Sequence, residues 1–171
     1  MKYRDFFEFK EVINEVMDSG YSYKDTFETE NVALSDDEGI VNRFKPVQII
    51  HFNAENIPYI WYAKQSNYDE HTWTIAFGVN IKKDERGKYT LDLELVGAKN
   101  PYKILGTVIN ITNRFIELDE FWEMYRLMFT PNGENRKNLY INRIVPRIEG
   151  FELEHVSGDP TEYDVSIIRR Y

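Results

Sequence analysis

Two segments in which a large apolar residue recurs at every second position constrain the fold of this chain more than any other feature. Thr72–Asn80 carries Trp73, Ile75, Phe77 and Val79 on one face, and Lys88–Val96 carries Tyr89, Leu91, Leu93 and Leu95 on one face. Because side chains of a strand point alternately to opposite sides, both segments are predicted to be strands with one buried face. The short charged turn at residues 82–87 between them predicts antiparallel pairing.

Three other segments have the spacing of helices. Pro101 is predicted to open a well-buried helix that runs to about Ile116. A second helix is predicted over residues 134–147, where Pro146 should kink or end it. Near the N-terminus, residues 4–18 predict an amphipathic helix that stops before Gly20.

The remaining apolar runs predict further strands at Val47–Asn53, Tyr59–Gln65, Trp122–Thr130, Phe151–Val156 and Tyr163–Arg170. Together these elements predict an α+β fold. Its twisted sheet is mostly antiparallel and is combined with an N-terminal helix and two core helices. Residues 1–20 are assigned to the N-terminal amphipathic helix and residues 21–171 to a single α+β domain, a usual size for one domain.

Composition excludes several classes of function. The chain has no cysteine, which excludes disulfides, thiolate metal sites and a cysteine nucleophile. Its three histidines lie far apart in the sequence, so no metal site is predicted. A net charge of −8 disfavours binding to nucleic acid, because phosphate contacts need a basic surface. No secretory signal or membrane-spanning run is evident, so the predicted location is the cytoplasm.

One motif in the helix after Pro101 suggests a family. The run Lys103-Ile104-Leu105-Gly106-Thr107-Val108 resembles the pattern [QR]-x-x-G-x-[GA] of the Gcn5-related N-acetyltransferases, abbreviated GNAT. The order of elements after residue 45 also resembles that fold: antiparallel strands, helix, strand, helix and a terminal hairpin. In that family the backbone N–H groups of this loop hold the pyrophosphate of acetyl-CoA, as a helix N-terminus holds any anion.

The resemblance implies a pyrophosphate loop at Lys103, Gly106 and Thr107, with acetyl-CoA as the possible cofactor. Lys103 and Val108 depart from the family pattern, so the resemblance implies a degenerate cofactor loop. Asn135, Leu139-Tyr140 and Gly150-Phe151 resemble a second GNAT arrangement. In that arrangement the tyrosine protonates the leaving thiolate of CoA, so Tyr140 is the implied general acid.

The helix predicted over residues 134–147 has a further resemblance. Its pattern Asn135-Arg136-Lys137-Asn138-Leu139-Tyr140 is similar to a motif of uncharacterised tailed-bacteriophage proteins, which implies a phage origin. Helical spacing also brings Arg136, Arg143 and Arg147 near one face, where they are candidates for binding a partner.

Three functional hypotheses follow. The leading one is a phage-encoded GNAT-like protein with a degenerate cofactor loop that acts as a protein-interaction module, as a virion component or a binder of a host factor. The alternative is an active acyl-CoA-dependent N-acetyltransferase that uses Tyr140. A third is a nucleic-acid-associated protein that uses its aromatic residues, 15% of the chain, and the arginine face of residues 136–147.

Overall fold

The structure is a computed structural model that describes residues 15, 17, 19–24, 26–33, 44–66, 68–83, 89–92, 100–118 and 123–171. The helix predicted at residues 4–18 falls almost wholly outside these residues. The strands are β1 (Glu28–Ala33), β2 (Phe44–Ala54), β3 (Ile57–Gln65), β4 (Thr72–Lys83), β5 (Tyr89–Asp92), β6 (Arg126–Phe129), β7 (Phe151–Asp159) and β8 (Glu162–Arg169). The two principal helices are α2 (Pro101–Ile116) and α3 (Glu134–Leu139).

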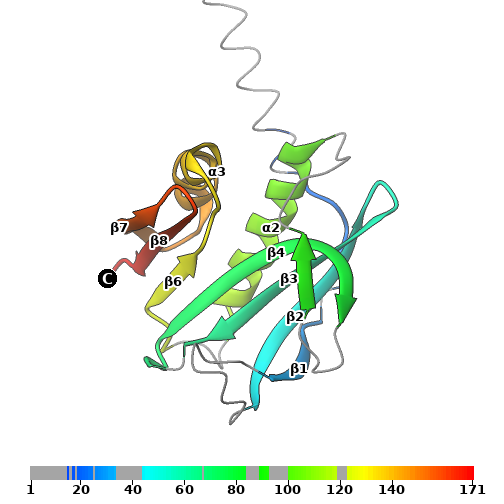
Figure 1. Cartoon of the computed structure of the whole chain (residues 1–171), viewed down its shortest axis with the longest axis horizontal. Helices are drawn as coiled ribbons and strands as arrows, with labels where there is room; N and C mark the ends of the chain where they lie inside the picture. Colours follow the sequence, from blue (N-terminus) through cyan, green and yellow to red (C-terminus); the bar gives the residue numbers. More distant parts are fainter. Residues whose placement is uncertain are drawn as a thin grey trace, which may run out of the picture.

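All eight strands form one sheet, with the order β1-β2-β3-β4-β6-β8-β7 and with β5 paired to β4 (Figure 1). Every pair is antiparallel except β4 and β6, which are parallel. The predicted α+β class and the mostly antiparallel sheet are therefore confirmed. None of the helices in the described part of the chain is long and apolar enough to cross a membrane.

Local sequence accounts for the tight connections of this sheet. Glu55 and Asn56 join β2 to β3 with φ angles of 51° and 71°. A two-residue hairpin with both residues in the left-handed region matches the twist of the strands that it connects. At the other end of the sheet, Gly158, with φ of 95°, lies near the end of β7, before the turn into β8.

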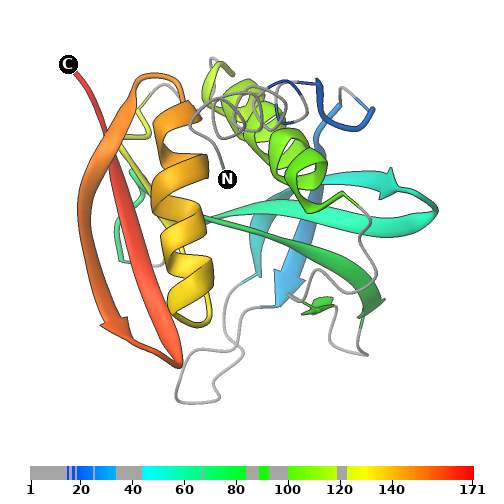
Figure 2. The ribbon, with the colours of Figure 1, turned by 90° about the horizontal axis from the view of Figure 1, so that it is seen from above.

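Helix α2 crosses the face of β2, β3 and β4, while α3 lies along β6, β7 and β8 (Figure 2). Most of the 16 residues of α2 are buried, as their two apolar stripes predict. The ring of Phe115 contacts Trp61 and Trp73 edge to face, with ring centroids 5.4 and 5.3 Å apart. The buried Trp61 indole N–H donates to the Thr112 hydroxyl at 3.1 Å, so this buried donor is satisfied.

The second predicted helix is present but not uniform. Helix α3 continues as a π-helix over Tyr140–Ile144 and as a 3₁₀ turn over Val145–Arg147, in which Pro146 lies. Two predicted strand bounds are corrected: Lys82 and Lys83 belong to β4 rather than to a turn, and β6 is only four residues long. Pairing with β5 extends β4 as far as Lys83.

Gly106 marks the closest approach of another segment to α2. A Cβ atom at this position would overlap the backbone carbonyl of Met17. Gly20, which has a φ angle of 53°, lies next to Thr107. The Tyr21 N–H donates to the Thr107 hydroxyl at 2.6 Å. The glycine therefore lets the chain before β1 pack directly on the helix backbone.

We expect Gly106→Ala to lower the free energy of unfolding by roughly 2–4 kcal/mol, because overpacking costs ~1–3 kcal/mol and more where backbone must move. Urea unfolding followed by circular dichroism measures this change. Arg114→Ala, on the exposed side of the same helix, is the matched control and should change stability by less than about 0.5 kcal/mol. Equal stability of the two variants would mean that the segment around Met17 does not rest on Gly106.

The part of the sheet formed by β6, β8 and β7 is joined by a polar network. Arg126 of β6 donates from Nε and Nη2 to the two carboxylate oxygens of Glu154, both at 2.8 Å. The Ser166 hydroxyl of β8 donates to Glu154 at 2.7 Å. These interactions, Arg126 first, lower the pKa of Glu154 to about 2.

Because the pKa of Glu154 is lowered in the folded state, the free energy of unfolding is expected to fall at acidic pH. Since Glu154 has a lower pKa folded than its ordinary value of 4.5, its contribution is complete above about pH 4.5 and is lost as the pH falls toward 2. We expect the stability difference between the wild type and Glu154→Gln, from urea unfolding, to shrink between pH 6 and pH 3. In an Arg126→Gln background the same difference should change much less with pH. An unchanged pH dependence in that background would contradict the assigned role of Arg126.

Candidate functional site

The strands β4 and β6 separate after a very short parallel pairing. They pair only through Thr72–Thr74 and Arg126–Met128, and β4 next pairs on that side with β5, from Val79 onward. On this edge, residues 75–78 of β4 have no strand partner in the described part of the chain. Every second one of these residues directs its N–H and C=O to β3, so the others have backbone groups on this edge without a strand partner among the described residues, where a ligand with amide groups could bond.

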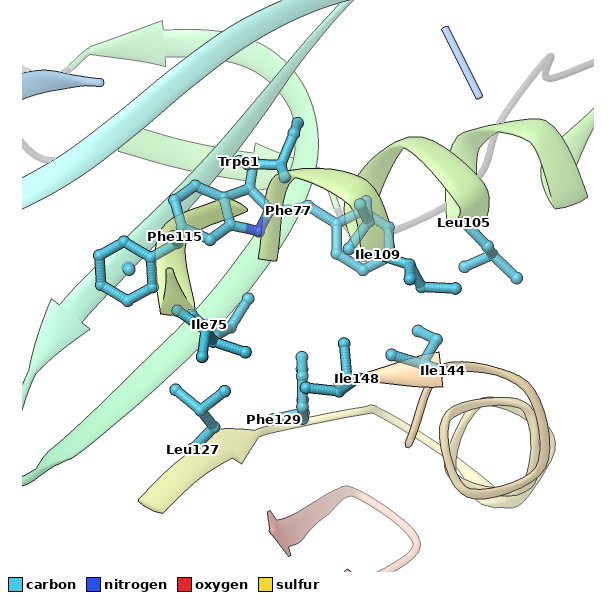
Figure 3. Close-up of a cluster of buried hydrophobic side chains, with 14 of the residues drawn as sticks. Trp61, Ile75, Phe77, Leu105, Ile109, Phe115, Leu127, Phe129, Ile144 and Ile148 are labelled. Carbon is cyan, nitrogen blue, oxygen red and sulfur yellow. The ribbon is translucent and has the colours of Figure 1, made fainter. Parts of the chain in front are cut away.

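A pocket lies in this gap, and we call it the wedge. Its lining residues come from β4, α2, the segment after β6, and α3: Ile75, Ala76, Phe77, Leu105, Thr130, Pro131, Asn132, Arg136, Leu139 and Tyr140. Its cavity volume is about 40 Å³, enough for part of a slender ligand. Figure 3 shows the apolar wall of this region, where Phe77 and Leu105 lie on one side and Phe129 on the other.

Tyr140 lies between the two diverging strands. Its ring stacks on Phe77 of β4 at 6.1 Å between centroids and meets Phe129 of β6 edge to face at 5.5 Å. Burial raises the pKa of the Tyr140 phenol, and the nearby Arg136 charge opposes this only in part. The phenol therefore stays protonated at neutral pH. Its hydroxyl has no hydrogen-bond partner among the described residues, so it is available to a ligand.

Arg136 is the charged residue of the wedge. It is half-buried, and its guanidinium forms neither a hydrogen bond nor an ion pair with any described residue. The adjacent Lys137, by contrast, bonds to Glu134 and lies over the Tyr163 ring at 4.5 Å. The two neighbouring cations thus differ: Lys137 is engaged in the fold, while Arg136 faces the pocket.

The other two arginines predicted to bind a partner do not line the wedge. Arg147 donates from Nη1 to the backbone carbonyl of Arg143 at 3.1 Å, and its own carbonyl accepts from Asn113 at 3.0 Å. The structure therefore separates Arg136 from Arg143 and Arg147. The physical reason is the π-helix at Tyr140–Ile144, which changes the angular spacing that a regular α-helix would give.

The residues of the implied pyrophosphate loop lie inside α2 rather than in a loop before it. Gly106 and Thr107 are buried in the second turn, under the segment that contains Met17 and Tyr21. Lys103 has its ammonium 4.6 Å from the centre of the Tyr21 ring. A phosphate has no access to Gly106 or Thr107 in this arrangement, which corrects the loop that the motif implied.

The actual N-terminus of α2 offers little to an anion. Pro101 has no N–H, the Lys103 N–H donates to the Asn100 side chain, and the Ile104 N–H donates to the Asn100 carbonyl. Of the first four residues, only Tyr102 keeps an N–H without a partner among the described residues. A pyrophosphate bound here would therefore receive few of the donors that a helix N-terminus normally supplies.

Sequence reasoning missed the wedge because it depends on which strands are neighbours. Asn132 and Pro131 line it, and their only local signal is the turn Pro131-Asn132-Gly133 after a strand. No cluster of three or more histidine, aspartate or glutamate side chains suited to a metal occurs among the described residues. Comparisons with models of protein families, with curated proteins and with solved structures find no match for this chain.

Two substitutions at Tyr140 distinguish the contribution of its ring to stability from that of its hydroxyl. We expect Tyr140→Phe to change the free energy of unfolding by less than about 0.5 kcal/mol, because the hydroxyl lacks a partner in the described fold. Tyr140→Ala should cost roughly 3 kcal/mol, since it leaves a cavity between Phe77 and Phe129. Urea unfolding of both variants tests this. A large cost for Tyr140→Phe would show that the hydroxyl is structural.

Proposed function

We propose that this protein is a GNAT-like acyltransferase that binds the thioester arm of an acyl-CoA in the wedge and transfers the acyl group to an amine. The observation that carries the proposal is the open edge of β4 beside the unpartnered hydroxyl of Tyr140. The order of elements supports it too. Antiparallel strands are followed by α2, by β6 parallel to β4, by α3 and by the hairpin of β7 and β8.

The dimensions of the open edge suit this ligand. Residues 75–78 span about 13 Å, at ~3.3 Å per residue of strand. The pantetheine arm of CoA contains two amides and is about as long as four residues of extended chain, roughly 14 Å. It can therefore add to the edge of β4 as a short strand would, with its amides bonded to the backbone.

The chemistry assigns a definite role to Tyr140. The acceptor amine attacks the thioester carbonyl, a C–N bond forms, the C–S bond breaks, the nitrogen loses a proton to solvent, and the departing thiolate takes a proton from a donor that solvent then reprotonates. A neutral phenol lining the wedge is placed to donate that proton, which makes Tyr140 the general acid of the proposal. Its raised pKa keeps it protonated but also makes it a weak acid, so slow turnover is expected.

The second candidate is the protein-interaction module, a phage-encoded GNAT-like protein without activity. The observation that favours it is the N-terminus of α2, where Asn100 and Pro101 leave few donors for the pyrophosphate of CoA. On this hypothesis the wedge is a remnant that Tyr140 fills, and the function depends on a protein partner. The two candidates differ in whether CoA binds at all.

Thermal unfolding with and without millimolar CoA or acetyl-CoA distinguishes them. A ligand at a hundredfold excess over its Kd stabilises the folded state by about 2.7 kcal/mol. For a domain of this size we expect the midpoint to rise by roughly 5–10 °C. Release of free thiol from acetyl-CoA in the presence of an amine then measures transfer, and Tyr140→Phe should slow it by about tenfold or more.

A matched pair of variants assigns the binding to the wedge. Leu139→Trp places a larger side chain in the pocket wall and should abolish the thermal shift. Leu153→Trp makes the same change on β7, away from the pocket, and should preserve the shift. Absence of any shift in the wild type would sink the acyltransferase and leave the interaction module. A shift that Leu139→Trp does not affect would place the CoA site elsewhere.

A further inference from the structure

The wedge contains a cation whose role the proposed transfer does not explain. Arg136 lines the same pocket as Tyr140 and is half-buried, and its guanidinium forms no hydrogen bond or ion pair within the described part of the chain. A guanidinium in such a place has given up part of its hydration without gaining a carboxylate from the protein. An anionic group on a ligand would supply the missing partner.

The position of Arg136 limits which anion this is. Arg136 and Tyr140 are four residues apart on one helix, so their Cβ atoms are about 6 Å apart. In the proposed function Tyr140 marks the place of the thioester sulfur. The phosphate of a CoA molecule is a full pantetheine arm away from that sulfur, roughly 14 Å when extended. The anion at Arg136 therefore belongs to the reacting end of the substrates and not to the nucleotide end of the cofactor.

The chemistry of the pocket favours a carboxylate. A guanidinium presents two parallel N–H groups that match the two oxygens of a carboxylate. The cavity is small, about 40 Å³, and the Asn132 amide beside it offers a further hydrogen bond. Tyr140 is the other titratable side chain of the lining and is neutral, so no negative charge there competes with the ligand.

We propose, on the basis of the proposed acyl transfer, that Arg136 is a specificity residue that binds a carboxylate a few bonds from the reacting carbonyl. That carboxylate has two possible sources with the same chemistry. It is carried either by the acyl group, as in a dicarboxylic acyl thioester, or by the acceptor, as in an amino acid whose amine is acylated. In both cases the charge pair orients the reacting atoms next to Tyr140.

The test compares ligands that differ only in the carboxylate. For the acyl source, the affinities of succinyl-CoA and butyryl-CoA are measured by thermal shift, since their acyl chains have equal length. For the acceptor source, the rate of thiol release is measured with glycine and with glycinamide. We expect one of these pairs to show a preference of roughly 10–100-fold for the carboxylate, the effect of a hydrogen bond to a charged group.

Substitution then assigns the preference to one side chain. Arg136→Gln should remove the preference, so that the ratio within the pair falls to near one. Arg143→Gln, on the same helix but outside the wedge, is the matched control and should keep the ratio. The unfolding midpoints of both variants without ligand show whether either change disturbs the fold.

The possible outcomes distinguish a failure of the role of Arg136 from a failure of the proposed acyl transfer. If CoA thioesters bind but neither pair shows a preference, or if the preference survives Arg136→Gln, the role of Arg136 is overturned while the acyltransferase stands. If no CoA thioester binds, the proposed function fails and the role of Arg136 fails with it. A preference that both arginine variants abolish would also overturn the assignment, because it would not depend on the wedge.

Discussion

The packing of α2 across the sheet is the constraint on which the rest of the structure depends. After β4 and β5 the chain crosses the sheet as this helix and returns as β6, parallel to β4. Apolar residues of α2 fill the face of the sheet, and Phe115 packs between Trp61 and Trp73. The chain before β1 is fixed by the same helix, because Gly106 lets the backbone at Met17 rest against it.

The crossover also explains why a pocket exists. The strands β4 and β6 stay together for three residue pairs and then diverge, and the ring of Tyr140 enters between Phe77 and Phe129. An apolar ring suits this position, because aromatic contacts of this kind add stability beyond the burial of area. The hydroxyl of that ring adds nothing to the packing of the described fold. Phenylalanine would pack equally well here, and the proposed function gives the hydroxyl its role.

Patterns within one segment predicted the elements, but not how they meet. Alternation located β4 but ended it at Asn80 rather than Lys83, and Pro101 with helical spacing placed α2 from Pro101 to about Ile116, as observed. The motif around Gly106 was misleading, because a glycine needed for close backbone packing and a glycine needed for phosphate look alike in a sequence. The grouping of Arg136 with Arg143 assumed a regular helix, and the π-helix after Leu139 changes that spacing. The wedge depends on strand neighbours far apart in sequence, for which local periodicity carries no signal.

On the proposed function an anion would meet this chain at two places, and their donors differ in a way that bears on what the wedge would select. At the start of α2, Pro101 has no N–H and the Lys103 N–H donates to the Asn100 side chain, so few donors remain for a pyrophosphate. In the wedge, Arg136 keeps its donors free of protein partners among the described residues. On the proposed acyl transfer, binding energy is thus expected to be concentrated at the reacting end of the ligand and not at its nucleotide. Binding energy near the reacting atoms favours discrimination between substrates over tight binding of the cofactor.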